Sequence, residues 1–350
     1  MRLLLVYHIA EDAGSAQDIH NYRRAAEALG HEIVVYGPPH ALPSFRFSRD
    51  VEAADAVIFL FEWTTQLRFG DQLDLARLVG TVPRARRIVI DCDGAYNDAI
   101  AVDGDYNHRT PEASRRWIGV CDSLADKICQ PTLHPLRPNV RPFLFHAYDR
   151  AWERPLDLAA REYGMVYVGH SKFRWRPMER VLRAIEPFRE RVGRIALVGH
   201  GWDALPWWAV PMQIEDYYYT DQAYLRKLAV EFVPPVPFEQ VIGWMSKGIF
   251  SPVIYRPLFS HLRLVTCRTF ETPAANTLPL FGLDEGYVRE VYGERATELV
   301  LPGDHAEDKI ADMLCRPEHY AEILVDLRRH LAAHHAYEVR LRQLLDIVES

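Results

Sequence analysis

Short apolar runs alternate with amphipathic helices along the chain, and this rhythm limits the fold more than any other feature of the sequence. Leu3–Tyr7, Ile33–Tyr36, Ala56–Phe61 and Arg87–Asp91 are nearly continuous apolar runs. Continuous runs are typical of parallel strands that are buried on both faces. Because repeated strand–helix–strand units imply right-handed crossovers, the first part of the sequence predicts a doubly wound α/β sheet.

The rhythm stops at a proline-rich stretch and then restarts. Prolines crowd the segment from Pro131 to Pro155, which predicts a domain boundary. Further strands are predicted at Met165–Val168, Ile195–Val198, Val230–Val233, Gly248–Tyr255 and Leu278–Phe281. The 350 residues exceed one ordinary core, so we expect an α/β protein of two doubly wound, Rossmann-like domains that face each other across a cleft. The expected division is residues 1–155, residues 156–330 and a terminal helix at 331–350.

Composition narrows the classes of function. The net charge of −7 and the pI of about 6.1 argue against a general nucleic-acid-binding surface. No apolar run approaches the roughly 18 residues that cross a bilayer, and the apolar start at Met1–Tyr7 is predicted to be a buried strand rather than a signal peptide. The five cysteines show no C-x-x-C pair, which is typical of free thiols in a reducing cytoplasm. We therefore expect a cytoplasmic protein with no transmembrane segment and no nucleic-acid partner.

The first segment that indicates a ligand is the loop from Gly169 to Pro177, between a predicted strand and a predicted helix. Gly169 lets the backbone approach a ligand, and Pro177 suits a first helical turn. A helix start offers free N–H groups to an anion, and Lys172, Arg174 and Arg176 add positive charge. The loop is a candidate site for a nucleoside diphosphate, and a solvated basic loop is the alternative.

Two further segments follow strands of the second domain. In Cys267–Phe281, the candidates are Arg268, Glu271 and Thr272. A carboxylate at a helix start can accept both hydroxyls of a ribose, although such a residue is also a common cap or ion-pair partner. In the loop and short helix after the strand at Val230–Val233, Pro237 and Phe238 offer backbone on which the base of a nucleotide could rest. Simple packing is the alternative for this segment.

Together these segments resemble the group-1 glycosyltransferases, and most closely their spore-maturation, CgeB-type branch. The matching motifs are Val166-Tyr167-Val168-Gly169, Gly199-His200-Gly201-Trp202, Val236-Pro237-Phe238-Glu239, Arg268-Thr269-Phe270-Glu271-Thr272-Pro273-Ala274-Ala275, Leu299-Val300-Leu301-Pro302-Gly303-Asp304 and His334-His335-Ala336-Tyr337-Glu338-Val339-Arg340. They span roughly residues 160–348, whereas the first half shares only the general rhythm. The resemblance implies a GT-B fold, a metal-independent reaction, a nucleotide-sugar donor, and a final helix that packs back on the first domain.

The resemblance also implies roles for individual residues. Glu271 would bind the ribose at the cleft, and Arg268 with the loop Lys172–Arg176 would face the diphosphate. The nucleotide-sugar is then a substrate and no cofactor is expected, while the acceptor is an unknown small molecule, glycan or protein. Two positions depart from the family, because Arg263 stands where many relatives carry an acid that contacts the donor sugar, and Asn276 replaces a usual glycine. The resemblance further implies retention of the anomeric configuration, a course that needs no strong carboxylate base, and the sequence shows none.

Other polar residues near strand ends are weaker candidates. His8 follows the first strand and is a candidate catalytic base or acceptor ligand, with a structural histidine as the alternative. Asp91-Cys92-Asp93-Gly94 looks like an Asp-x-Asp metal motif, but two oxygens alone do not hold such an ion. We therefore predict a turn at this strand end, lining the cleft, and no metal site. Asp103-Gly104-Asp105 is predicted to be an ordinary turn.

Two other functions remain open from the sequence. A nucleotide-sugar epimerase can use the same fold, but it needs several cleft carboxylates and histidines that the sequence does not clearly supply. A glycosyltransferase-like binding protein without activity is the second alternative, and Arg263 and Asn276 are the residues that favour it.

Overall fold

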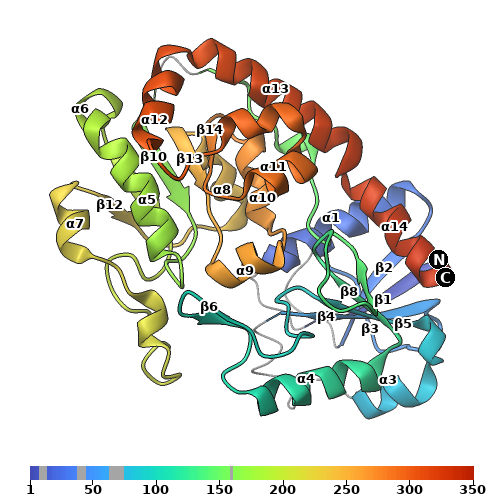
Figure 1. Ribbon diagram of the computed structural model, residues 1–350. Helices are drawn as coiled ribbons and strands as arrows, with labels where there is room; N and C mark the ends of the chain where they lie inside the picture. Colours follow the sequence, from blue (N-terminus) through green and yellow to red (C-terminus); the bar gives the residue numbers. More distant parts are fainter. Residues whose placement is uncertain (8–13, 38–44, 63–74, 158–160) are drawn as a thin grey trace.

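In the computed structural model the chain forms two parallel β-sheets, each covered by helices (Figure 1). The structure describes residues 1–7, 14–37, 45–62, 75–157 and 161–350. The first sheet has seven parallel strands in the order β3-β2-β1-β4-β5-β8-β9. The strands of this half are β1 (Arg2–Tyr7), β2 (Glu32–Tyr36), β3 (Phe47–Ser48), β4 (Ala56–Phe61), β5 (Arg87–Asp91), β8 (Lys127–Gln130) and β9 (Val140–Pro142), with a separate hairpin of β6 (Ala101–Val102) and β7 (Asp105–Tyr106).

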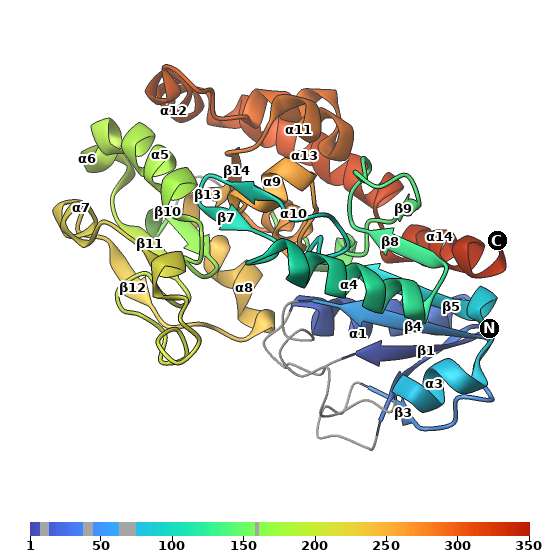
Figure 2. The ribbon, with the colours of Figure 1, turned by 60° about the horizontal axis from the view of Figure 1, so that its bottom comes forward.

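Both faces of strand β1 are buried, which explains why its apolar run is continuous. The helices of this half are α1 (Gly14–Ala28), α3 (Leu75–Thr81) and α4 (Pro111–Leu124), joined by the last helix of the chain, α14 (Tyr337–Glu349). Leu3 and Leu5 pack on one face of the sheet with α1 and α14, whereas Leu4 and Val6 pack on the other face with α3 and α4. Figure 2 shows α4 lying across the strands of this sheet. Both faces are therefore covered, as a parallel sheet requires.

The second sheet has five parallel strands in the order β12-β11-β10-β13-β14. Its strands are β10 (Tyr163–Val168), β11 (Ile195–Val198), β12 (Glu231–Val233), β13 (Gly248–Val253) and β14 (Leu278–Phe281). Its helices are α5 (Trp175–Ile185), α6 (Arg189–Val192), α7 (Gln222–Lys227), α8 (Phe238–Met245), α9 (Pro257–Leu262), α10 (Cys267–Ala274), α11 (Glu285–Tyr292), α12 (Ala306–Cys315) and α13 (Pro317–His334). The two sheets confirm the predicted α/β class. Helix α5 begins at Trp175, so Pro177 lies inside its first turn rather than at its start.

The last helix, α14, leaves the second half of the chain and packs against the first. Leu341 and Leu344 are buried in one cluster with side chains of α1, and the Tyr337 hydroxyl donates a hydrogen bond of 2.6 Å to Asp18. His146 makes a second hydrogen bond to Asp18, at 2.7 Å. Figure 1 shows α14 beside α1. The core of the first half therefore includes the C-terminal helix.

The β6–β7 hairpin of the first half makes a polar contact with the second half. Gly104, with φ of 82°, forms the predicted turn. Asp105 is not an ordinary turn residue, however, because its side chain is fully buried. It accepts hydrogen bonds from the Arg256 Nε at 2.8 Å and from the backbone N–H of Leu258 at 2.9 Å. This buried ion pair ties the hairpin to the start of α9.

The proline-rich stretch contains a β-strand that the sequence did not predict. Strand β9, at Val140–Pro142, lies at the edge of the first sheet, where a proline is tolerated because one side of the strand needs no ladder hydrogen bond. The neighbouring strand β8 was also missed, because Lys127-Ile128-Cys129-Gln130 mixes polar and apolar residues. Among the described residues, no helix is long and apolar enough to cross a membrane.

Candidate functional site

Helix α10 brings Arg268 and Glu271 together at the carboxyl edge of the second sheet. Thr266 and Thr269 form a capping box that fixes the start of this helix. Arg268 and Glu271 lie one turn apart and form an ion pair. The Arg268 Nε also donates to the carbonyl oxygen of Val168 at 2.7 Å. The pair therefore sits where β10 ends, which is the edge at which ligands bind in open parallel sheets.

Glu271 lies deeper than a residue at the cleft surface, where we expected it, because only 1% of its side chain is exposed. Its Oε2 accepts a hydrogen bond from Arg268, and its Oε1 is buried with no partner among the described residues. Burial lowers the pKa of Arg268, but the Glu271 carboxylate outweighs this effect, so the pKa of Arg268 is raised above its usual value. A buried acceptor without a donor is costly, and a hydroxyl of a bound ligand would satisfy it.

The loop after β10 is shaped by glycines. Gly169 has φ of 156°, and its carbonyl oxygen accepts a hydrogen bond of 2.7 Å from the Trp202 indole. Gly199, after β11, packs so closely on the backbone of Gly169 that a side chain there would collide with it. Two strand ends of the second sheet therefore meet through bare backbone, and the role of Gly169 in binding a ligand stays a prediction.

The basic side chains of this loop do not all point the same way. Phe173 has φ of 57°, and this left-handed turn folds Arg174 back on its own loop. The Arg174 Nη1 bonds to the Nδ1 of His170 at 2.9 Å and donates to the carbonyl oxygen of Lys172 at 3.0 Å. Burial and the Arg174 charge hold the pKa of His170 well below its usual value. Neutral His170 thus accepts the bond and positions the guanidinium.

Lys172 faces the first half of the chain. Its Nζ lies 5.9 Å from the ring centre of Phe173 and 5.6 Å from that of Tyr217, within the range of cation–π attraction. Burial and the nearby charge of Arg256 lower the pKa of Lys172 to about 8, although Asp93 of the first half opposes this change. Lys172 therefore remains a cation at neutral pH, close to carboxylates of the other half.

Asp91 and Asp93 occupy the end of β5, where the sequence suggested a metal motif. Asp91 is buried and accepts hydrogen bonds from the N–H groups of Ala95 and Tyr96 and from Gln130, at 2.8–3.0 Å. Asp91 is therefore a structural acceptor that holds the predicted turn. Asp93 is different, because its Oδ2 is buried with no hydrogen-bond partner among the described residues.

Comparison with known proteins gives a family match for part of the chain. Residues 176–346 match a protein family described as glycosyl transferase-like. A search of curated proteins found no significant match. The spore-maturation branch that we expected is not confirmed by the family match.

Solved structures that are similar to this chain cover its whole length. The β-glucosyltransferase of phage T4 has a TM-score of 0.58 at 12% identity, with 99% of each chain covered. The same enzyme in complex with UDP and Mn²⁺ has a TM-score of 0.59 at 13% identity, with full coverage of both chains. An α-glucosyltransferase in complex with UDP-glucose and DNA has a TM-score of 0.64 at 12% identity, covering 100% of this chain and 99% of the other. These likenesses confirm the GT-B fold.

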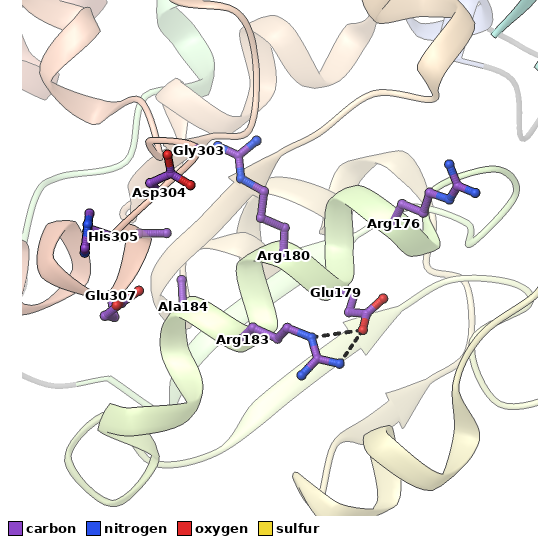
Figure 3. Close-up of a pocket in the computed structure, with 10 residues that line it drawn as sticks. Arg176, Glu179, Arg180, Arg183, Ala184, Gly303, Asp304, His305 and Glu307 are labelled. Atoms are coloured by element: carbon purple, nitrogen blue, oxygen red, sulfur yellow. Dashed lines mark hydrogen bonds and ion pairs between the residues drawn. The ribbon is translucent and has the colours of Figure 1, made fainter. Parts of the chain in front are cut away.

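One predicted donor contact, Arg176, lines a cavity that does not include the Arg268–Glu271 pair. Arg176 is exposed and lies 3.8 Å from Asp103. It lines a separate cavity of about 500 Å³ between α5 and α12 (Figure 3). Arg180 and Arg183 line the same cavity, and Figure 3 shows Arg183 held by Glu179. No other predicted site residue of the described chain lines this cavity.

The contacts predicted for the base and the sugar are less polar than expected. Pro237 is exposed and precedes the first residue of α8, and the half-buried Phe238 begins that helix. They offer the start of α8 to a ligand, but no charged group. Thr272 is fully buried, and its hydroxyl lies 3.5 Å from the Sδ of Met245. The Thr272 side chain therefore packs inside the second half, and its contact with the donor stays a prediction.

The two departures from the family pattern have structural roles. Arg263 bonds to Asp284 at 3.1 Å and to Glu290 at 3.4 Å, so it ties α9 to α11. The Asn276 Oδ1 accepts hydrogen bonds from the Arg161 guanidinium at 2.7 Å and from the backbone N–H of Asp157 at 2.9 Å. Both residues are accounted for by packing within the protein, so neither is evidence that the donor site has been lost.

Chelation is expected to leave nucleotide binding unchanged. Both carboxylate oxygens of Asp91 accept hydrogen bonds from within the protein. Among the described residues, no group of three or more metal-ligating side chains occurs. His8, our other candidate at this edge, lies outside the described residues. The measurement is titration calorimetry of UDP with EDTA and with added Mn²⁺ or Mg²⁺. Binding that disappears on chelation and returns with Mn²⁺ would show that this prediction is wrong.

Proposed function

We propose that the protein transfers a sugar from a nucleoside diphosphate to an acceptor. One observation carries this proposal: the Glu271 Oε1, buried without a partner among the described residues, beside Arg268 at the carboxyl edge of the second sheet. A ribose hydroxyl would satisfy Oε1, and the arginine would face the phosphates. The match of residues 176–346 to the glycosyl transferase-like family supports the same conclusion.

The donor that we propose to test first is UDP-glucose, because similar structures hold UDP or UDP-glucose. The second half, residues 156–330, would bind this donor, and residues 1–155 with the helix at 331–350 would bind the acceptor. Catalysis would rest on positioning and on stabilisation of the departing diphosphate by cationic side chains such as Lys172 and Arg268. The nucleotide-sugar is consumed, so it is a substrate and not a cofactor, and no metal takes part.

The acceptor that we propose is a small molecule, glycan or protein. One similar structure holds DNA, but the net charge of −7 gives this chain no general attraction for a phosphate backbone. DNA therefore enters the test as a control acceptor. A cytoplasmic location remains part of the proposal. The resemblance to the group-1 glycosyltransferases favours retention of the anomeric configuration.

Binding of UDP is the first test of the proposed function. UDP at about 100 times its dissociation constant is expected to stabilise the folded protein by about 2.7 kcal/mol, which a thermal-shift measurement detects easily. Uridine is the matched control, and it should stabilise the protein less at the same concentration because it lacks the phosphates. Release of glucose from UDP-glucose then separates an enzyme from a binding protein. Failure of both UDP and the other nucleoside diphosphates to shift the melting temperature would contradict the proposal.

A further inference from the structure

The long connection between β11 and α7 folds into a small lobe. We call residues 202–219 the aromatic lobe, because six of them are Trp or Tyr. Ala209, Ile214 and Tyr218 are buried together in a cluster separate from the main cores, and the Trp208 indole donates a hydrogen bond of 3.3 Å to the Tyr218 hydroxyl. Figure 1 shows the lobe as a projection below α7. This packing fixes the backbone that carries the exposed residues of the lobe.

The aromatic lobe is held by contacts from both halves of the chain. The Arg109 guanidinium of the first half donates to the carbonyl oxygens of Gln213 at 2.9 Å and Met212 at 3.3 Å. Tyr217 of the lobe stacks on Phe173 of the loop after β10, with ring centres 4.3 Å apart. The N–H of Phe173 also donates a hydrogen bond of 2.6 Å to the carbonyl oxygen of Tyr217. The lobe is therefore preformed, and a ligand can bind there without having to order it.

The base of the lobe lies at the strand end where we propose that the donor binds. Gly199, the residue after β11, packs directly on the backbone of Gly169. The next residue, His200, contacts Trp208 edge to face, with ring centres 4.8 Å apart, and Trp208 contacts Trp207 in the same way at 5.8 Å. A row of rings therefore leads from the carboxyl edge of the second sheet to the surface of the lobe.

The surface of the aromatic lobe carries large apolar side chains. Seven such side chains are exposed in the part of the chain that the structure describes, and four of them belong to the lobe: Leu205, Trp207, Val210 and Tyr219. Trp207 is the most exposed, at 82%. Single exposed apolar residues need no explanation, but several within one segment indicate an interaction site.

The charges of the lobe decide which kind of partner fits. Asp203, Glu215 and Asp216 are its only charged residues, so the lobe contains no Lys or Arg. Carboxylates repel the phosphates of a nucleic acid and the surface of an anionic membrane. A neutral sugar suits the lobe, because the C–H face of a sugar ring packs flat on an aromatic ring, whose face carries partial negative charge. The hydroxyl groups of the sugar can donate hydrogen bonds to the carboxylates.

We infer that the aromatic lobe binds a neutral sugar chain of the acceptor, with the Trp207 ring as its main stacking surface. The inference rests on the proposed function and narrows the acceptor from a small molecule, glycan or protein to a glycan. A protein partner also covers apolar surface, but the row of rings from His200 to Trp207 favours a molecule that must reach the donor edge, as an acceptor does. The lobe positions the sugar chain and takes no part in making or breaking bonds.

Replacing Trp207 by Ala tests this role. The probe is an array of neutral and anionic oligosaccharides, and calorimetry then follows the neutral oligosaccharide that the wild type binds most tightly. We expect Trp207→Ala to weaken this binding at least about tenfold, as truncation of a central aromatic residue does in other binding surfaces, whereas Trp207→Phe should keep most of it. Leu136→Ala is the matched control, because Leu136 is 55% exposed but lies outside the lobe. Both alanine variants should keep the wild-type melting temperature, because both side chains are exposed.

Sugar transfer gives a second readout that a change in stability would not produce. The donor is UDP-glucose, and the acceptor is the oligosaccharide selected on the array. Trp207→Ala should raise the KM for this acceptor at least about tenfold, while the dissociation constant of UDP stays within about threefold. Release of glucose to water should proceed at the wild-type rate, because water does not bind to the lobe.

The outcomes separate this inference from the proposed function. If the wild type binds UDP but no neutral oligosaccharide, or if Trp207→Ala binds the oligosaccharide as tightly as the wild type, the proposed function stands and the role of the lobe is wrong. Binding to phosphatidylcholine vesicles that Trp207→Ala abolishes would also overturn the inference, in favour of a lobe that faces a membrane. If no nucleoside diphosphate binds, the proposed function is wrong, and the acceptor role of the lobe fails with it even where Trp207→Ala loses the oligosaccharide.

Discussion

Replacing Asp105 by Asn is expected to lower the free energy of unfolding by about 3 kcal/mol or more. Asp105 is fully buried and accepts hydrogen bonds from Arg256 and from the Leu258 backbone. Removing one partner of a buried ion pair leaves the other charge buried and uncompensated, which typically costs about 3–5 kcal/mol. Arg256 also stacks on Phe173 at 4.6 Å and on Phe259 at 5.1 Å, so it cannot turn freely to solvent.

The sequence offers a matched control two residues away. Asp103 lies in the same hairpin, but 67% of its side chain is exposed and its nearest cation, Arg176, is 3.8 Å away. Exposed ion pairs contribute about 0–1 kcal/mol, so Asp103→Asn should change the urea midpoint very little. Asparagine is chosen for both positions because Asp103 has φ of 48°, a conformation that asparagine tolerates. Equal shifts in the two variants would contradict the assignment of Asp105 as the tie between the halves.

Strands could be predicted from the sequence where side chains on both faces of the strand are buried. The strands Ala56–Phe61, Arg87–Asp91, Ile195–Val198 and Leu278–Phe281 have the bounds that their apolar runs predict. Strand β8 could not be predicted in this way, because the stem of Lys127 is buried while its ammonium group donates to the carbonyl oxygen of Val348 at 2.8 Å. That partner lies at the other end of the chain, and no local pattern reveals it.

The candidate site could be predicted only in part, for the same reason. Arg268 and Glu271 are one helical turn apart, so their pairing follows from local spacing. Arg176 shares the basic loop with Lys172 in the sequence, but the left-handed turn at Phe173 and the start of α5 separate the two side chains. Asp93 looked like part of an ordinary strand-end turn. Burial, Glu62 and Asp91 raise its pKa, and Arg256 and Lys172 of the second half oppose them, but no local pattern brings these residues together.

Replacing Glu271 by Gln is expected to weaken UDP binding at least tenfold. A hydrogen bond to a charged group contributes about 1.5–3 kcal/mol, and the buried Oε1 of Glu271 is the acceptor proposed for a ribose hydroxyl. Glutamine keeps the volume and can still accept a hydrogen bond from Arg268. Because losing the charge of a buried pair also lowers stability, the melting temperature of the variant is measured first to show that it is folded. Glu285→Gln is the control, because Glu285 is exposed on α11 and pairs with Arg289. Its UDP affinity should match the wild type.

Arg174 distinguishes binding of the phosphates from binding of the nucleoside in the same experiment. Its guanidinium is bound by His170 and the Lys172 carbonyl and has no carboxylate partner among the ion pairs of the described chain, so its charge is available to a diphosphate. Arg174→Gln should therefore weaken UDP much more than uridine, whereas Glu271→Gln should weaken both, because both contain the ribose. Calorimetry of each ligand with each variant gives the four affinities. Equal losses of UDP and uridine in Arg174→Gln would place the phosphates elsewhere, and an unchanged affinity in Glu271→Gln would reduce this glutamate to the partner of Arg268.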